Sequence, residues 1–196
     1  MNQENLEKLQ NTYSEVEDTI YRLLLDLKVC SGELAKDDEN QFWRRTFIRT
    51  LFATIEGINY QFKRLALCVA DCSALKLDTA TETLLKEESY ELKNNGQVKT
   101  SKAKLRTADN LLFSWNIVGV VCEVTNKVDQ SGDDWQNFIE SIKIRDRITH
   151  PKHLEDLNIS DSNSETIFRT YFWFESNITT ALQLLDKAKD KLESKF

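Results

Sequence analysis

A stretch in the last third of the chain, residues 142–154 (IKIRDRITHPKHL), holds both histidines and the only proline. Arg145 stands five residues before His150, and Asp146 follows the arginine. An imidazole can accept and donate a proton near neutral pH, and a guanidinium offers bidentate hydrogen-bond donors to an anion. The stretch therefore has the groups that acid–base chemistry at a phosphate needs, with Asp146 placed to orient either cation.

The same residues also fit a purely structural role. Cations near a helix C-terminus interact favourably with the helix dipole, so Arg145, Arg147 and His150 could cap a helix that ends before Pro151. The residues alone leave both interpretations open. His153 is interpreted as an exposed loop residue.

Long helices are expected to position this stretch. One Pro and five Gly among 196 residues, with abundant Leu, Glu and Lys, favour helix over sheet. Apolar residues at steps of three and four predict amphipathic helices. Pro151 disfavours the α conformation at His150, so one helix should end there. The expected helices cover 4–30, 38–72, 107–127, a fourth from the SGDDW signal at 131–135 to His150, and 164–192.

Residues 76–106 interrupt the helical pattern. A short helical piece near 79–88 precedes a segment that alternates and turns on Asn94-Asn95-Gly96, which predicts a small hairpin-like insertion near 89–104. The predicted fold is all-α, a single domain over 1–196 built as a bundle of about five helices with this insertion.

Several classes of protein are set aside by composition and motifs. The net charge of −6 argues against a surface that coats nucleic acid or an anionic membrane as a whole. The sequence has no P-loop, no dinucleotide-binding glycine pattern and no HExxH, and its four cysteines lack metal-site spacing, so we expect no cofactor, no metal and reduced core cysteines. The N-terminus lacks signal-peptide features and the apolar run 111–124 is too short to span a bilayer, which predicts a cytoplasmic protein without a membrane partner.

The six residues RDRITH, 145–150, resemble the signature of the HEPN superfamily of all-helical domains, in which Arg is followed by Asn, Asp or His and, a few residues later, by His. Arg145, Asp146 and His150 match this pattern position by position, and beyond the motif the likeness is architectural. The resemblance implies a metal-independent endoribonuclease in a toxin or defence role, held by an antitoxin or other regulatory protein. It also implies RNA ends with a 2′,3′-cyclic phosphate.

The resemblance assigns roles to individual residues. His150 would transfer protons, Arg145 would stabilise the negative phosphorane, and Asp146 would orient the cations. Some members place a polar residue of an earlier helix against the motif, and Glu56 is the candidate here. The alternative for Glu56 is a solvated polar face of the 38–72 helix, which also carries Arg45, Arg49, Tyr60 and Lys63.

One departure concerns the toxin subgroup that pairs with a nucleotidyltransferase antitoxin. Its motif continues with Tyr two residues past the histidine, where this chain has Lys152.

The resemblance further implies a homodimer in which two motifs line one cleft. The predicted fourth helix is compatible with this, because it has two apolar stripes, which leaves one apolar face for the core and one for a partner. One stripe consists of Trp135, Phe138, Ile139 and Ile142, and the other of Ile144 and Ile148.

A second cationic region lies in the insertion. Five basic residues and no acid occur between Leu92 and Ala108, which could track a phosphate backbone. Lys99, Lys102 and Lys104, with Arg147 and Lys152 of the motif region, are the candidate RNA contacts. The alternative is a solvated hairpin whose edges lysines protect. For the chain as a whole, the alternative function is a non-catalytic helical module that binds protein or RNA, with a structural motif.

Overall fold

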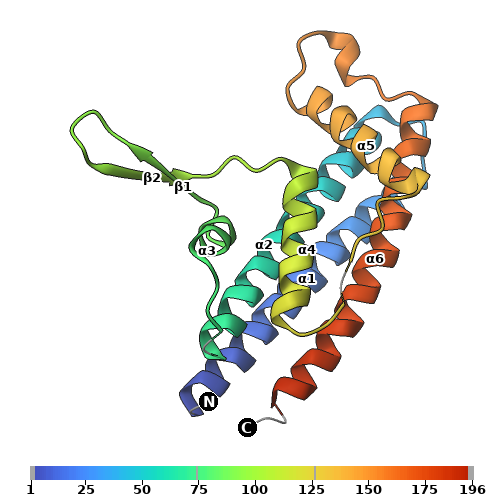
Figure 1. The fold of residues 1–196 in the computed structure, drawn as a ribbon. Coiled ribbons are helices and arrows are strands. Elements are labelled where there is room, and N and C mark those ends of the chain that lie inside the picture. Colours follow the sequence, from blue (N-terminus) through green and yellow to red (C-terminus); the bar gives the residue numbers. More distant parts are fainter. Residues whose placement is uncertain (1–2, 74, 126, 194–196) are drawn as a thin grey trace. The chain divides into compact units, whose positions relative to one another are not determined.

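The computed structural model describes residues 3–73, 75–125 and 127–193 and confirms the predicted all-α class (Figure 1). Within these ranges there are six α-helices, one 3-10 turn and one two-stranded sheet. The elements are α1 (Gln3–Leu34), α2 (Gln41–Cys72), α3 (Thr79–Leu85), β1 (Glu88–Leu92), β2 (Val98–Lys102), α4 (Thr107–Val121), α5 (Asp133–Thr149), the 3-10 turn η1 (Leu154–Leu157) and α6 (Asp161–Glu193).

The elements fall into two compact units. Unit 1 contains residues up to 17, residues 59–127 and residues from 184 onward, and unit 2 contains residues 18–58 and 128–183. The long helices α1, α2 and α6 each contribute residues to both units. The single domain over 1–196 stays a prediction.

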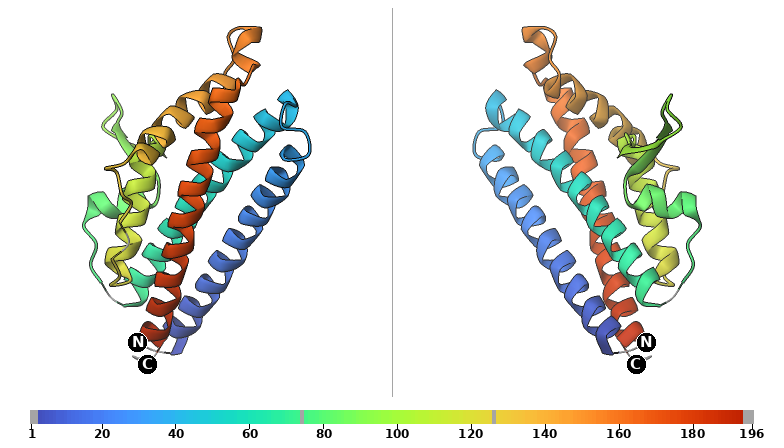
Figure 2. Two further views of the ribbon diagram at one scale, coloured as in Figure 1. Left: turned by 90° about the vertical axis from the view of Figure 1, so that its right-hand side faces the viewer. Right: turned by 90° about the vertical axis from the view of Figure 1, so that its left-hand side faces the viewer.

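Unit 1 is built on the first half of α1, the second half of α2, and α4. Trp115 of α4 is buried and its indole Nε1 donates to Asn59 Oδ1 at 2.9 Å. The end of α6 lies beside the start of α1 (Figure 2), where the Lys189 ammonium is 5.6 Å from the ring centroid of Tyr13. Buried aromatic surface therefore holds these four segments together.

The predicted hairpin is present in unit 1 as β1 and β2, paired antiparallel with Leu92 opposite Val98. Gly96 has a φ of 77°, a left-handed conformation that glycine adopts at little cost, so the Asn-Asn-Gly turn forms where the sequence indicated. In Figure 1 the hairpin projects away from α3 and α4 as an arm.

Unit 2 packs α5 against α2 and α6 through an aromatic cluster. Phe138 of α5 lies 6.3 Å from Phe52 of α2 and 5.2 Å from Trp173 of α6, centroid to centroid. Beside it, the buried hydroxyls of Ser141 and Thr170 are 2.8 Å apart. These contacts fix the rotation of α5, which carries the motif.

Several helix ends differ from expectation, three of them by several residues or for a reason that the structure shows. The first helix continues through Ser31-Gly32 to Leu34, because Cys30 and Leu34 are both buried and hold that turn against the core. The helix α4 ends at Val121 instead of 127, since Glu123 takes a left-handed φ of 57°. The last helix begins earlier than expected, at Asp161.

Two interpretations of exposed faces were wrong. Ile144 and Ile148 are buried within the chain itself, so this stripe of α5 is not free for a partner. Lys63 is also fully buried, paired with Glu87 at 3.0 Å, and does not belong to a solvated face. The four cysteines are free and buried, as predicted.

Candidate functional site

The motif occupies the last turns of α5 and the residues that follow. Ile144 and Ile148 anchor this end of the helix in the core of unit 2, which leaves the intervening residues on the outer side. The helix ends at His150, whose backbone N–H still donates to the Asp146 carbonyl at 3.0 Å while its φ of −125° and ψ of 59° are no longer helical. Pro151 cannot continue the helix, so the predicted end is confirmed.

Arg145 is held from three sides. Its Nη2 is 3.0 Å from Glu56 Oε1 of α2, and its Nε is 3.3 Å from Asp146 Oδ1. The guanidinium carbon lies 5.0 Å from the centroid of the buried Phe52 ring, which is cation–π geometry. The Arg145 side chain is only 19% exposed, and two carboxylates and a ring fix the direction of its guanidinium.

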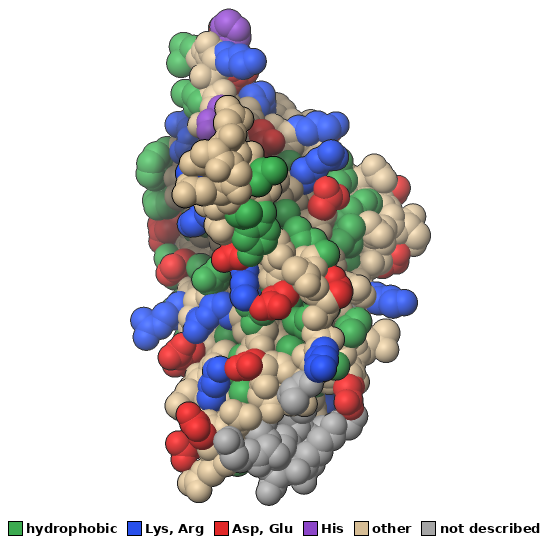
Figure 3. All heavy atoms as spheres, turned by 60° about the vertical axis from the view of Figure 1, so that its left-hand side comes forward, with side chains coloured by type: hydrophobic (Ala, Val, Ile, Leu, Met, Phe, Trp, Pro, Cys, Tyr) green, Lys and Arg blue, Asp and Glu red, His purple; other side chains and the backbone are tan. Residues whose placement is uncertain are grey.

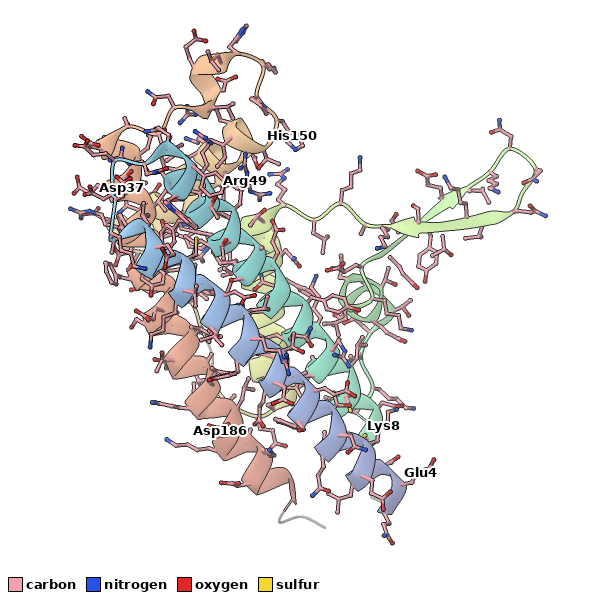
Figure 4. The ribbon with its side chains drawn as sticks, turned by 180° about the vertical axis from the view of Figure 1, so that it is seen from behind. Glu4, Lys8, Asp37, Arg49, His150 and Asp186 are labelled. Atoms are coloured by element: carbon pink, nitrogen blue, oxygen red, sulfur yellow. The ribbon has the colours of Figure 1, made fainter. Side chains whose placement is uncertain are left out.

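His150 has a different environment. Its side chain is exposed, and within the described ranges the imidazole makes no hydrogen bond or ion pair with another residue. Histidine side chains are visible on the molecular surface in Figure 3. Arg49 of α2 reaches the same end of α5, where its Nη2 donates to the Ile148 carbonyl at 3.0 Å (Figure 4). His150 is therefore open to solvent at a helix end that a second arginine stabilises.

The loop after the motif is fixed by Arg147 and Asp156. Arg147 Nη1 donates to the carbonyls of Asp156 and Asn158, both at 3.1 Å, and Nη2 donates to Asn163 Oδ1 at 2.9 Å. Asp156 Oδ2 accepts from the backbone N–H groups of His153 and Lys152, and these two bonds lower the pKa of the Asp156 carboxyl. The loop conformation thus depends on the Arg147 guanidinium and the Asp156 carboxylate.

Two residues of α2 that were not singled out from sequence hold the far end of this loop. Arg44 is buried, donates from Nη1 to the Ile159 carbonyl at 2.7 Å and pairs with Asp161 at 2.7 Å. Gln41 both donates to the Ile159 carbonyl and accepts from its N–H. The sequence does contain a signal for Arg44, which is a basic residue on the apolar face of a helix. Such a side chain needs a polar partner when it is buried.

The structure brings some of the predicted site residues together. Arg145, Asp146 and Glu56 are in direct contact, and His150 lies at the same end of α5.

Other predicted residues have different surroundings. Arg147 is committed to loop carbonyls, which favours a structural role over RNA contact. Lys152 and His153 are exposed. The candidate RNA contacts Lys99, Lys102 and Lys104 belong to unit 1, whereas the motif belongs to unit 2.

The described part of the chain lacks two further kinds of feature. No group of three or more His, Cys, Asp or Glu side chains there could hold a metal ion. Among those residues, no helix has the length and apolar character needed to cross a membrane. Protein-family models, curated proteins and solved structures give no significant match to this chain.

Proposed function

We propose that this chain is a metal-independent endoribonuclease of the HEPN type, which cleaves RNA at Arg145 and His150. The observation that carries the proposal is the way Arg145 is held. Glu56, Asp146 and the ring of Phe52 fix its guanidinium at the end of α5, next to the point where an exposed His150 leaves the helix. A pre-oriented guanidinium and an accessible imidazole at the same helix end suit charge stabilisation and proton transfer at one phosphate.

The proposed reaction uses the hydroxyl of the RNA itself. His150 accepts the proton of a ribose 2′-OH, the 2′ oxygen bonds to the adjacent phosphorus, and the bond from phosphorus to the 5′ oxygen breaks. An imidazolium gives the departing 5′ oxygen its proton, and Arg145 balances the extra negative charge of the phosphorane. The products carry a 2′,3′-cyclic phosphate and a 5′-OH.

The second imidazole in this scheme comes from a second copy of the chain, as the HEPN resemblance implies. The dimer is therefore part of the proposal, although the stripe of Ile144 and Ile148 does not support it. Sedimentation at high micromolar concentration tests it. A strictly monomeric protein would leave one His150 to perform both proton transfers and would remove the composite cleft.

Glu56 acts in this proposal as a positioning residue. Without RNA, its carboxylate and that of Asp146 both pair with the Arg145 guanidinium. The Glu56 side chain is 48% exposed, so its ion pair is weak, and an RNA phosphate can replace it while Asp146 and the Phe52 ring still orient the guanidinium. The variant Glu56→Gln should consequently lower KM for RNA while changing kcat less, because it removes a competing carboxylate but keeps a hydrogen-bond acceptor.

A toxin or defence role belongs to the same proposal, because an enzyme that cleaves cellular RNA must be restrained. An antitoxin or other regulatory protein would supply that restraint. Induced expression should arrest the growth of a bacterial host with the wild-type chain and not with His150→Ala at equal protein levels.

A non-catalytic helical module is the second candidate, and a specific observation favours it. Arg49 already donates to a terminal carbonyl of α5, and Arg147 organises the following loop, so the cations around the motif have clear structural partners. In that case Arg145 would serve only to join α5 to Glu56 and Phe52.

The experiment that separates the two candidates compares two histidines. His150→Ala removes the proposed proton carrier, whereas His153→Ala removes another exposed imidazole three residues later. Cleavage of single-stranded RNA in EDTA should fall about 100-fold or more for His150→Ala, the scale of a lost acid–base group, and stay near wild type for His153→Ala. Equal activity of both variants, or none in the wild type, would favour the non-catalytic module.

A further inference from the structure

The hairpin of unit 1 separates its side chains into two different faces. In an antiparallel pair, alternate residues of each strand point to the same side. With Leu92 opposite Val98 and Tyr90 opposite Thr100, these four residues share one face. The opposite face is polar and carries Ser89, Glu91, Lys99 and Ser101.

The first face presents apolar side chains to solvent. Tyr90 is 54% exposed, Val98 is 66% exposed and Leu92 is 77% exposed. A two-stranded hairpin on its own is only marginally stable in water, and exposed apolar side chains that cluster on one face indicate a binding surface. If the hairpin were only a solvated loop whose edges are protected by lysines, the exposed apolar side chains of Tyr90, Leu92 and Val98 would have no explanation.

Cations surround this apolar face. Lys102 shares it, directly opposite Glu88, and Lys93, Lys99 and Lys104 lie next to the turn, on the opposite face and at the base of the arm. No acid occurs from Lys93 to Arg106, in a chain whose net charge is −6. The only ion pair recorded for these lysines among the described residues, Lys99 with Glu91, is 3.8 Å long and more than half exposed on both sides, so it is easily exchanged for another anion.

The base of the arm is well anchored. The buried ammonium of Lys63 pairs with Glu87 at 3.0 Å, and the Glu87 carbonyl accepts from the Ala103 N–H at 2.7 Å. On the exposed face, the Tyr90 hydroxyl donates to Glu88 Oε2 at 2.6 Å, which restrains the ring. The apolar face is therefore preformed, and little ordering cost remains for a ligand.

We propose that this face is a platform for single-stranded RNA, with a base stacked on Tyr90, apolar contacts from Leu92 and Val98, and the lysines on the phosphates. The inference rests on the proposed ribonuclease function and names how its substrate is selected. Aromatic side chains bind unpaired bases through their π-faces, while lysines follow the backbone without reading sequence. A duplex hides its base faces, so the platform favours single strands over duplexes.

The test measures binding of a short, labelled 2′-O-methyl RNA, which cannot be cleaved through its 2′ position, to the wild-type chain by fluorescence anisotropy in EDTA. Tyr90→Ala should weaken single-strand binding by roughly 5- to 150-fold, the range found for loss of one stacked base, and Tyr90→Phe should restore most of it. Tyr21→Ala is the matched control, since Tyr21 is also an exposed tyrosine, at 68%, but lies on α1.

The lysines are tested separately with the charge reversal of Lys99, Lys102 and Lys104 to Glu. This variant should weaken binding about equally for all sequences and reduce the slope of log affinity against log salt by about 2, as expected for three contacts to single-stranded phosphates. An unchanged salt slope would mean that these lysines only protect the hairpin edges.

Several results would overturn the platform. It would be excluded if Tyr90→Ala bound RNA as tightly as the wild type, or if the wild type bound duplex and single-stranded RNA equally well. It would also be excluded if Tyr90→Ala lost self-association and kept its RNA affinity, because the face would then be a protein interface. These outcomes are independent of the cleavage test at His150. The chain can cleave RNA through His150 even if the hairpin face does not bind it, and the hairpin face can bind RNA even if the chain does not cleave it.

Discussion

The coupling between Arg145 and Glu56 can be tested through stability alone, without any RNA. Glu56→Gln removes one half-exposed ion pair, which should cost about 0.2–1 kcal/mol. Arg145→Ala removes that pair, the pair with Asp146 and a cation–π contact with Phe52 of about 0.5–1 kcal/mol, so about 1–3 kcal/mol is expected. In the double variant the shared pair is lost only once, which leaves a coupling energy of about 0.2–1 kcal/mol.

Urea unfolding followed by far-ultraviolet circular dichroism gives these free energies. The matched control is the pair of Arg169 and Glu165 on α6, 2.9 Å apart and more than half exposed on both sides, where Arg169→Ala should cost less than Arg145→Ala. If Arg145→Ala leaves stability unchanged, or if its effect and that of Glu56→Gln simply add, the guanidinium is not held as described. Arg145 would then not be pre-oriented for a phosphate.

Three further predictions concern buried groups. Glu87→Gln should destabilise the chain by about 3 kcal/mol or more because it leaves the buried Lys63 charge uncompensated, while Lys63→Met should cost clearly less; urea unfolding compares them. Ser141→Ala leaves the buried Thr170 hydroxyl without its partner and should cost about 1–3 kcal/mol, much of which Thr170→Val in the same chain should recover. Burial raises the pKa of the Cys122 thiol to about 11, so this thiol stays protonated at neutral pH. A thiolate-directed reagent should therefore label Cys122 far more slowly in the native chain than in urea, and its native rate should rise as pH approaches the raised pKa; equal rates would contradict its burial.

Local patterns predicted much of the fold. The three- and four-residue apolar repeats indicated the long helices, Asn-Asn-Gly indicated the turn in which Gly96 has a positive φ, and Pro151 indicated the end of α5 at His150. Each of these features is decided by residues a few positions apart. Such features can be recognised without knowledge of the tertiary structure.

Features that depend on distant partners were not predictable in the same way. The helical pattern places Lys63 on a solvated stripe, because its partner Glu87 lies 24 residues away, beyond a helix end and a further short helix. The bond from Arg44 to the Ile159 carbonyl joins residues 115 positions apart. Ile144 shows the same limit, since an apolar stripe on a helix does not reveal whether its own chain or another chain covers it.

The ends of the RNA products test the central claim most directly. Wild-type protein should cleave single-stranded RNA in EDTA to fragments with a 2′,3′-cyclic phosphate and a 5′-OH, as mass spectrometry can show, because the proposed nucleophile is the 2′-OH of the substrate. The same RNA with a 2′-deoxy sugar at the cleaved linkage should resist cleavage there, and folded Arg145→Ala protein should be at least about 100-fold slower on the unmodified strand. Cleavage that requires Mg²⁺, leaves a 5′-phosphate or proceeds at the deoxy linkage would contradict the proposed roles of Arg145 and His150.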